Sequence, residues 1–219
     1  MKKTILLLSV LLALIFATNV YADSSKFGIG VRVGSVFFED GSMGVDLGGY
    51  GSIGTVDYSN ETTWFAGING TYQYNENLSV ELSIDRTGSS ESDFEGSGLS
   101  LKAGEITQTP VLLTVRYHIP VGMFSPYVGA GFGYYFNDYD KDNAFWNANA
   151  NVSLENSWGY HVNVGSEFFI TKSRDIALNI DLKYVWNEAE LEASVPGTKL
   201  TGTMDLDSFL VGLGIKYYF

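Results

Sequence analysis

Two histidines, His118 and His161, are the only histidines of the chain and the first side chains to consider for acid–base chemistry. Catalysis by a serine nucleophile needs a hydroxyl, a base and an orienting acid within hydrogen-bond reach of one another. Neither histidine has a serine two residues away, and Ser157 lies about 13 Å from His161 if the segment is an extended strand. We therefore expect no catalytic residue and no enzyme.

Patterns for metal or nucleotide binding are weak in this sequence. The chain has no Cys, and its His, Asp and Glu residues do not fall at metal-ligand spacing. The run from Asp138 to Asp142 alternates acids like a calcium loop but lacks the Gly and the distal Glu of such loops. The glycines from Gly129 to Gly133 are followed by aromatic residues that continue a strand, not by a helix that could hold phosphates. We expect neither a metal nor a cofactor.

A larger set of polar and charged residues recurs at every second position of extended segments. In a strand, this spacing places them on one side. The candidates for lining the lumen of a closed sheet are Arg32, Glu81, Ser83, Asp85, Arg116, His118, His161, Glu167, Asp181 and Lys183. Because isolated charges in a low-dielectric interior are costly, these charges must pair with one another or stay hydrated.

The elements that position these residues are strands with one apolar side. The clearest runs from Phe209 to Phe219, where every second residue is apolar and the last is the terminal Phe. Eight such segments can be read, at about 27–37, 64–74, 78–86, 106–119, 127–137, 157–170, 176–187 and 209–219. Three connections between them are short turns, whereas the links at about 38–63, 87–105, 138–156 and 188–206 are long and polar.

Alternating short and long connections are typical of outer-membrane barrels, and eight strands enclose an interior that side chains can fill. The sequence predicts an all-β protein, an eight-stranded antiparallel transmembrane β-barrel with short periplasmic turns and long extracellular loops. Aromatic residues near the strand ends are expected to form two interfacial girdles, namely Trp64, Tyr72, Tyr74, Tyr117, Tyr127, Trp158, Trp186, Tyr217 and Phe219. The alternative is a soluble β-sandwich with scattered surface aromatics.

Residues 1–22 have the pattern of a secretory signal peptide. A basic start at Lys2 and Lys3 precedes an apolar run, and Ala22 ends the predicted cleavage site. The run is too short to span a membrane comfortably, which disfavours the alternative of an anchor helix. Residues 23–219 then form one outer-membrane β-barrel domain. The whole chain has a formal net charge of −12 and no basic stripe, which argues against nucleic acid as a partner.

Five stretches of the sequence resemble the outer membrane protein W family of small barrels. They are Gly30–Gly34, Leu78–Leu82, Ser125–Gly131, Leu154–Gly159 and Leu206–Phe219. The resemblance implies location in the cell outer membrane, among its lipids and lipopolysaccharide, and passive passage of small, mostly hydrophobic solutes. It also implies a narrow apolar lumen with an exit sideways through the wall. The ending with Ile215, Tyr217 and Phe219 resembles the assembly signal that outer-membrane proteins show to the barrel-assembly machinery.

The inward charges leave three interpretations of the interior open. The first is a network of ion pairs that closes the lumen, so that a structural or surface-interaction function falls to the extracellular loops. The second is a narrow polar path. The third is a lumen that is apolar in its upper half, with Phe94, Phe145 and Trp146 contributing from the loops. The acidic loops either favour solubility or bind divalent cations that bridge to lipopolysaccharide.

Overall fold

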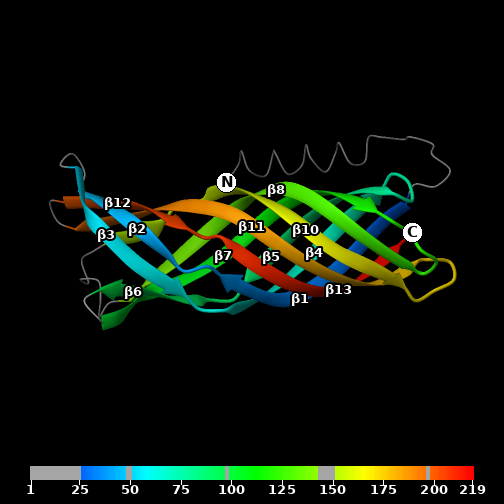
Figure 1. Ribbon diagram of the computed structural model, residues 1–219, viewed down its shortest axis with the longest axis horizontal. Helices are drawn as coiled ribbons and strands as arrows, with labels where there is room; N and C mark the ends of the chain where they lie inside the picture. Colours follow the sequence, from blue (N-terminus) through cyan, green and yellow to red (C-terminus); the bar gives the residue numbers. More distant parts are fainter. Residues whose placement is uncertain (1–25, 48–50, 97–98, 143–150, 196–197) are drawn as a thin grey trace.

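The computed structural model describes residues 26–47, 51–96, 99–142, 151–195 and 198–219. The predicted signal peptide, residues 1–22, lies outside the described residues, as do Phe145 and Trp146. The regular elements of the described part are all strands (Figure 1). No helix in that part is long and apolar enough to cross a membrane.

Thirteen strands occupy the described residues, whereas the sequence predicts eight. Eight of the thirteen overlap the predicted segments: β1 (Lys26–Phe38), β4 (Thr63–Gln73), β5 (Leu78–Thr87), β7 (Leu99–His118), β8 (Phe124–Lys141), β10 (Ser157–Phe169), β11 (Ile176–Val195) and β13 (Ser208–Tyr218). The other five lie in connections that were expected to be loops: β2 (Gly41–Leu47), β3 (Gly51–Asn60), β6 (Ser90–Gly96), β9 (Asn151–Leu154) and β12 (Thr198–Asp205).

The first group of eight strands pairs in a closed antiparallel ring. β1 pairs with β13 and β4, and the order continues through β5, β7, β8, β10 and β11 back to β13. Each strand of this ring has a neighbour on both sides, so the ring leaves no long unpaired edge. Figure 1 shows a slender tube whose strands run obliquely along its length.

The five additional strands lengthen the tube at one end, where Figure 1 labels β2, β3, β6 and β12. β12 pairs with β11 and β2, β2 pairs with β3, and β6 pairs with β3 and β7, while β9 pairs with β11. We call these five strands, with the adjoining ends of β7, β8 and β11, the extension. The expectation of long loops is wrong here, because these polar segments gain strand structure by pairing with the strands beside them.

Three short turns lie at the opposite end of the tube, at residues 74–77, 119–123 and 170–175. Gly122 has a φ of 63° in the second of them, a left-handed conformation that glycine adopts without strain. The first and last strands also meet at this end, where the Phe219 amide donates to the Phe27 carbonyl at 2.8 Å. Short connections and long connections therefore lie at opposite ends, as the sequence predicts.

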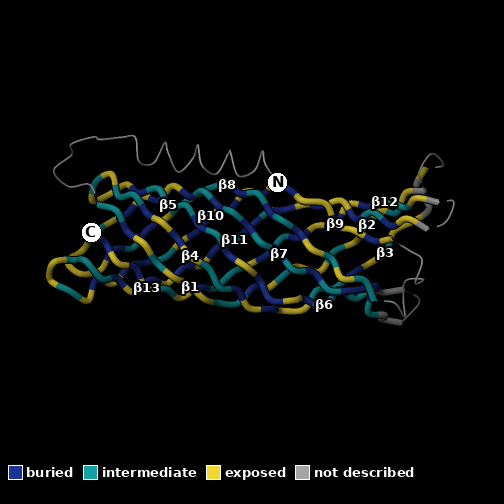
Figure 2. Tube along the Cα trace, turned by 180° about the vertical axis from the view of Figure 1, so that it is seen from behind, coloured by how far each residue is buried: buried dark blue, intermediate teal, exposed yellow. Residues whose placement is uncertain are grey.

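Along the ring strands, exposed residues alternate with buried ones (Figure 2), and the exposed residues are mostly apolar while many of the buried ones are polar. Outside, Ile29, Trp158 and Leu213 are 61%, 65% and 59% exposed. Inside, Glu81 and Arg116 are fully buried. Soluble monomers rarely expose a continuous apolar surface of this extent, so the wall is built to face something other than water.

Candidate functional site

The ten predicted lumen-lining residues all lie inside the ring, on β1, β5, β7, β10 and β11, and all are buried. The interior that they share is built in four layers between the short turns and the extension. Along β11 the inward residues Asp181, Val185, Asn187 and Leu191 belong to these layers in order. We call the layers the charged plug, the apolar collar, the amide belt and the upper apolar cluster.

Glu81 on β5 is the centre of the charged plug. Its carboxylate accepts hydrogen bonds of 2.5 and 2.6 Å from the two terminal nitrogens of Arg116 on β7. Lys216 on β13 donates to it at 2.7 Å, and Arg32 on β1 donates at 3.3 Å. Glu81 thus binds three cations from three strands. The plug consists of Arg32, Glu81, Asp85, Arg116, Glu167, Asp181 and Lys216.

Two further carboxylates hold the same cations from other sides. Asp85 binds Arg32 through two hydrogen bonds, of which the one from Nε is 2.8 Å long, and Ser83 accepts a third from Arg32 at 2.8 Å. Glu167 accepts a hydrogen bond of 2.8 Å from Lys216 Nζ. Because the ion pairs are buried and share partners, removing one member leaves another charge uncompensated, which costs about 3–5 kcal/mol in such sites.

Asp181 is the fourth carboxylate of the plug, and neutral donors hold it. Tyr127 OH donates to it at 2.7 Å and Asn163 Nδ2 at 2.6 Å, while Arg116 Nη2 lies 3.7 Å away. The sequence analysis placed Tyr127 in an interfacial girdle, and this is wrong. Its side chain is only 3% exposed, because the residue occupies an inward position of β8 and its hydroxyl finds a partner there.

Both histidines contact hydroxyl groups inside the ring. His118 Nε2 lies 2.9 Å from Ser79 Oγ, and its Nδ1 lies 3.3 Å from Ser125 Oγ. His161 Nε2 lies 2.9 Å from Thr114 Oγ1. Ser79 and Ser125 lie on the strands beside β7, and Thr114 on β7 lies two strands away from His161, so the spacing along each histidine's own strand does not reveal these partners. A hydroxyl beside an imidazole is one part of a catalytic arrangement, yet the hydroxyls and imidazoles are all buried away from solvent.

Lys183 is a predicted lumen residue that belongs neither to the plug nor to the hydroxyl contacts of the histidines. Its side chain is only 2% exposed. Among the described residues, no carboxylate oxygen lies within 4.0 Å of its ammonium. The structure therefore brings nine of the ten predicted residues into hydrogen-bonded groups and leaves Lys183 outside them.

The apolar collar lies directly on the extension side of the plug. It is formed by Leu112, Tyr135 and Val185, with the half-buried Leu210 packed against them. The Tyr135 hydroxyl is buried and has no hydrogen-bond partner among the described residues. The collar is thus an apolar constriction with one unsatisfied polar atom.

The amide belt separates the collar from the extension. Gln108 Nε2 donates to Asn137 Oδ1 at 2.9 Å, Asn137 Nδ2 donates to Ser157 Oγ at 3.2 Å, and Ser157 Oγ donates to Asn187 Oδ1 at 2.7 Å. The chain of hydrogen bonds crosses β7, β8, β10 and β11, so it holds half of the ring together at this level.

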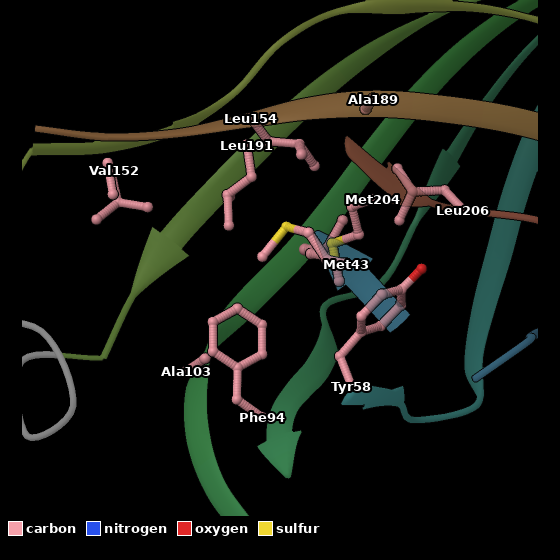
Figure 3. Close-up of a cluster of buried hydrophobic side chains, with 12 residues drawn as sticks. Met43, Tyr58, Phe94, Ala103, Val152, Leu154, Ala189, Leu191, Met204 and Leu206 are labelled. Atoms are coloured by element: carbon pink, nitrogen blue, oxygen red, sulfur yellow. The ribbon is translucent and has the colours of Figure 1, made fainter. Parts of the chain in front are cut away.

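The upper apolar cluster fills the interior of the extension (Figure 3). Its buried members are Met43, Tyr58, Phe94, Ala103, Ile106, Val152, Leu154, Ala189, Leu191, Ala193, Met204 and Leu206. Figure 3 shows Met43, Tyr58 and Phe94 pointing toward one another from separate strands. Sequence reasoning found only Phe94, because most members lie in segments expected to be loops or continue strands past their expected ends, and Ile106 is at the very start of an expected strand.

Tyr58 anchors one side of this cluster through its hydroxyl. The hydroxyl donates to the Asp205 carbonyl at 2.9 Å and accepts from the Asp205 amide at 2.8 Å. Burial raises the pKa of Tyr58 to about 12, so the hydroxyl stays neutral at physiological pH. The side chain thereby ties β3 to the end of β12 while its ring remains in the apolar cluster.

The extension carries acidic residues, and some of them pair with lysines. Lys102 Nζ lies 2.7 Å from Glu91 and 2.9 Å from Glu105, and these hydrogen bonds raise the pKa of Lys102 above its usual value. Within the described ranges, no group of three or more His, Asp or Glu side chains is arranged to hold a metal ion. The bridging of divalent cations by the loops stays a prediction.

The outer wall carries the aromatic residues and the predicted assembly signal. Trp64 and Trp158 project outward, as the girdle prediction requires. Ile215, Tyr217 and Phe219 are all exposed on one side of β13. The last strand therefore presents a continuous apolar row to the exterior.

Comparison with known proteins identifies the family in which this architecture occurs. Residues 23–219 match the family model described as the OmpW family. Outer membrane protein AlkL of Ectopseudomonas oleovorans is 25% identical over 92% of this chain and 87% of its own length. The dibenzothiophene metabolism operon protein PahQ of Pseudomonas aeruginosa is 24% identical over 100% of this chain and 99% of its own. The crystal structure of OprG from Pseudomonas aeruginosa superimposes with a TM-score of 0.78 at 22% identity, covering 90% of this chain and 96% of OprG.

Proposed function

We propose that this chain, which belongs to the OmpW family, takes up small, mostly hydrophobic solutes passively and has no enzymatic activity. The protein is an outer-membrane β-barrel and is located in the cell outer membrane. Lipids and lipopolysaccharide surround it there. In the proposal, the eight strands of the ring span the bilayer, the short turns are periplasmic, and the extension projects outside the cell.

The apolar outer wall supports this placement in the bilayer. Lipid offers the backbone no hydrogen-bond partners, so only a closed sheet can span it. The ring meets that condition, and its outward residues are apolar along the length of β1, β10 and β13. The exposed row of Ile215, Tyr217 and Phe219 is the proposed recognition site for the barrel-assembly machinery.

The upper apolar cluster is the observation that carries the proposed transport function. A hydrophobic solute gains free energy by leaving water for an apolar environment, at roughly 25 cal/mol per Å² of buried surface. The cluster offers that environment at the extracellular end, and Met43 and Met204 can repack around guests because methionine side chains are flexible. A relative named for a dibenzothiophene metabolism operon supports an apolar aromatic solute.

The charged plug supports a sideways exit. An apolar solute gains nothing from a layer in which Glu81, Arg116 and Lys216 are hydrogen-bonded to one another. In the proposal, the solute therefore leaves through the wall into the bilayer above the plug, as the family resemblance implies.

Uptake of dibenzothiophene by cells that make or lack the chain tests this function. We expect faster uptake with the chain. We expect Met43→Asp to lower the chain-dependent rate by about tenfold or more, because an unfavourable binding free energy of about 1.4 kcal/mol already lowers solute affinity tenfold. Ser42→Asp adds the same charge at the exposed neighbouring position and is expected to change little. Equal uptake with and without the chain would exclude the proposal.

A closed structural or surface-interaction barrel is the second candidate, and the buried ion pairs of the plug favour it. This candidate predicts no ion conductance in planar bilayers and no dependence of apolar uptake on the chain. The transport proposal also expects little conductance, so solute uptake is the measurement that separates the two.

A further inference from the structure

Lys183 is an interior cation that the plug leaves without a hydrogen-bonded counter-ion among the described residues. Arg32, Arg116 and Lys216 each bind at least one carboxylate at hydrogen-bond distance. Lys183 is as deeply buried as these three cations. Among the described residues, it makes neither an ion pair nor a hydrogen bond. A buried ammonium without a partner is costly, so the site calls for an anion or for water.

The nearest carboxylate along the strand attracts Lys183, but its hydrogen bonds go to other residues. Asp181 lies two residues before Lys183 on the same inward side of β11. Its carboxylate is already held by Tyr127 and Asn163 and lies beside Arg116. The ion pairs of the plug therefore form without a direct contact to Lys183.

The surroundings of Lys183 change from polar to apolar along the axis of the tube. Asn163 is its partner on β10, and Asp181 precedes it on β11. On the side of the extension, Val185 follows on β11, and Leu210 is its partner on β13. Both of these residues belong to the apolar collar. A ligand that fits this position has an anionic end at Lys183 and an apolar body that points toward the extension.

Other unsatisfied polar atoms belong to the same part of the wall, among them the acceptor Asn163 Oδ1 on the residue paired with Lys183. His161 is one rung from the Asn163–Lys183 pair, and its Nδ1 is buried with no partner among the described residues. Its other nitrogen contacts Thr114, so Nδ1 carries the hydrogen when Thr114 donates. Tyr135, whose hydroxyl is also unsatisfied, packs over Gly159 on the next rung. This part of the tube interior thus has one cation, Lys183, and two neutral groups, His161 Nδ1–H and the Tyr135 hydroxyl, that can donate hydrogen bonds.

We propose that Lys183 binds the carboxylate of a small amphipathic monocarboxylate, with the apolar body of that molecule against Val185, Leu210 and the rest of the collar. A single ammonium matches one carboxylate charge, whereas a doubly charged phosphate would need the arginine side chains that the plug already uses. The inference rests on the proposed function, because the ligand reaches Lys183 from the extracellular side, and it extends that function to solutes with one acidic group.

Calorimetric titration of the purified full chain in an uncharged detergent tests the site. Benzoate is the probe, and benzyl alcohol is its neutral counterpart. We expect the wild-type chain to bind benzoate more tightly than benzyl alcohol. We expect Lys183→Met to weaken benzoate binding by about tenfold or more and to leave the binding of benzyl alcohol within about twofold.

Two control variants keep the result interpretable. Lys183→Arg retains the charge and is expected to stay within about threefold of the wild-type affinity. Lys26→Met removes a lysine at the periplasmic end, outside the interior, and is expected to change nothing. If Lys183→Met does not fold, Lys183→Gln takes its place. Equal benzoate affinities in the wild-type chain and the neutral variant, or no preference for benzoate over benzyl alcohol, would overturn the inference.

The failure of this site and the failure of the proposed function give different results. If Lys183→Met leaves benzoate binding unchanged while dibenzothiophene uptake still depends on the chain, the anion site is wrong and the transport function stands. If uptake never depends on the chain, the transport function is wrong, and the titration still decides whether Lys183 binds carboxylates.

Discussion

The charged plug and the upper apolar cluster lie in the same tube, but their side chains are held in different ways. In the plug, Glu81 has a directed hydrogen bond to each of three cations. In the cluster, Met43, Phe94 and Met204 pack in one apolar group, and apolar contacts have no preferred direction. Buried, directed ion pairs suit a layer that closes and stabilises the ring, whereas the proposed function requires a cluster that adapts to guests.

The largest expected effect comes from the centre of the plug. Glu81→Gln keeps the shape of the side chain but leaves Arg116 and Lys216 buried with one less counter-charge. We expect the free energy of unfolding in detergent to fall by about 3–5 kcal/mol. Urea titration followed by the shift of heat-modifiable gel migration measures it.

Glu76→Gln is the matched control, because Glu76 is exposed in the first short turn and is expected to have almost no effect. If Glu81→Gln is as stable as the control, the interior is hydrated at this level. A wet polar path then replaces the closed plug, and the contrast between the two regions disappears.

A smaller and more local effect is expected in the cluster. Met204 is fully buried, and Met204→Ala is expected to cost about 2–4 kcal/mol of stability in the extension. Because the extension is tied to the ring by only a few strand pairings, the loss should appear as faster hydrogen exchange in β2, β3 and β12. Faster exchange in β5 and β7 near the plug as well would show that the two regions unfold as one unit.

Lys183→Met is expected to behave unlike any substitution in the plug. It removes a buried charge that has no carboxylate within 4.0 Å among the described residues, and it keeps most of the side-chain volume. We expect the stability to stay the same or to rise by about 1 kcal/mol. A loss of several kcal/mol in the same urea titration would show that Lys183 is a structural member of the plug.

The sequence predicts the ring well because one physical rule governs it. A wall with lipid outside and polar groups inside must alternate every second residue, so the eight strands of the ring and their inward residues can be recognised. The hydrogen-bond partners of the inward residues cannot be recognised in this way, because they depend on strand register. Glu81 meets Arg32, 49 residues away, and Lys216, 135 residues away, and no pattern along the chain joins them.

The extension was missed for a related reason. β2, β3, β6, β9 and β12 are short and carry acids, serines and glycines, so their own sequences favour loops. They become strands because β7 and β11 run on and offer unpaired backbone beside them. Once they are strands, Met43 and Met204 turn inward, and an apolar cluster forms that the separate segments do not reveal.

The smallest expected effect concerns an ion pair of the same chemical type outside the plug. Arg86 and Asp138 are 3.7 Å apart, and their side chains are 59% and 69% exposed. Water and salt screen such a pair, so Arg86→Gln is expected to change the free energy of unfolding by about 0.2–1 kcal/mol, and by less at high ionic strength. The same urea titration at low and high salt measures the change. A salt-insensitive loss as large as that of Glu81→Gln would mean that burial does not separate the plug from the surface pairs, and the stability assigned to the plug would then have to come from the strand pairings of the ring.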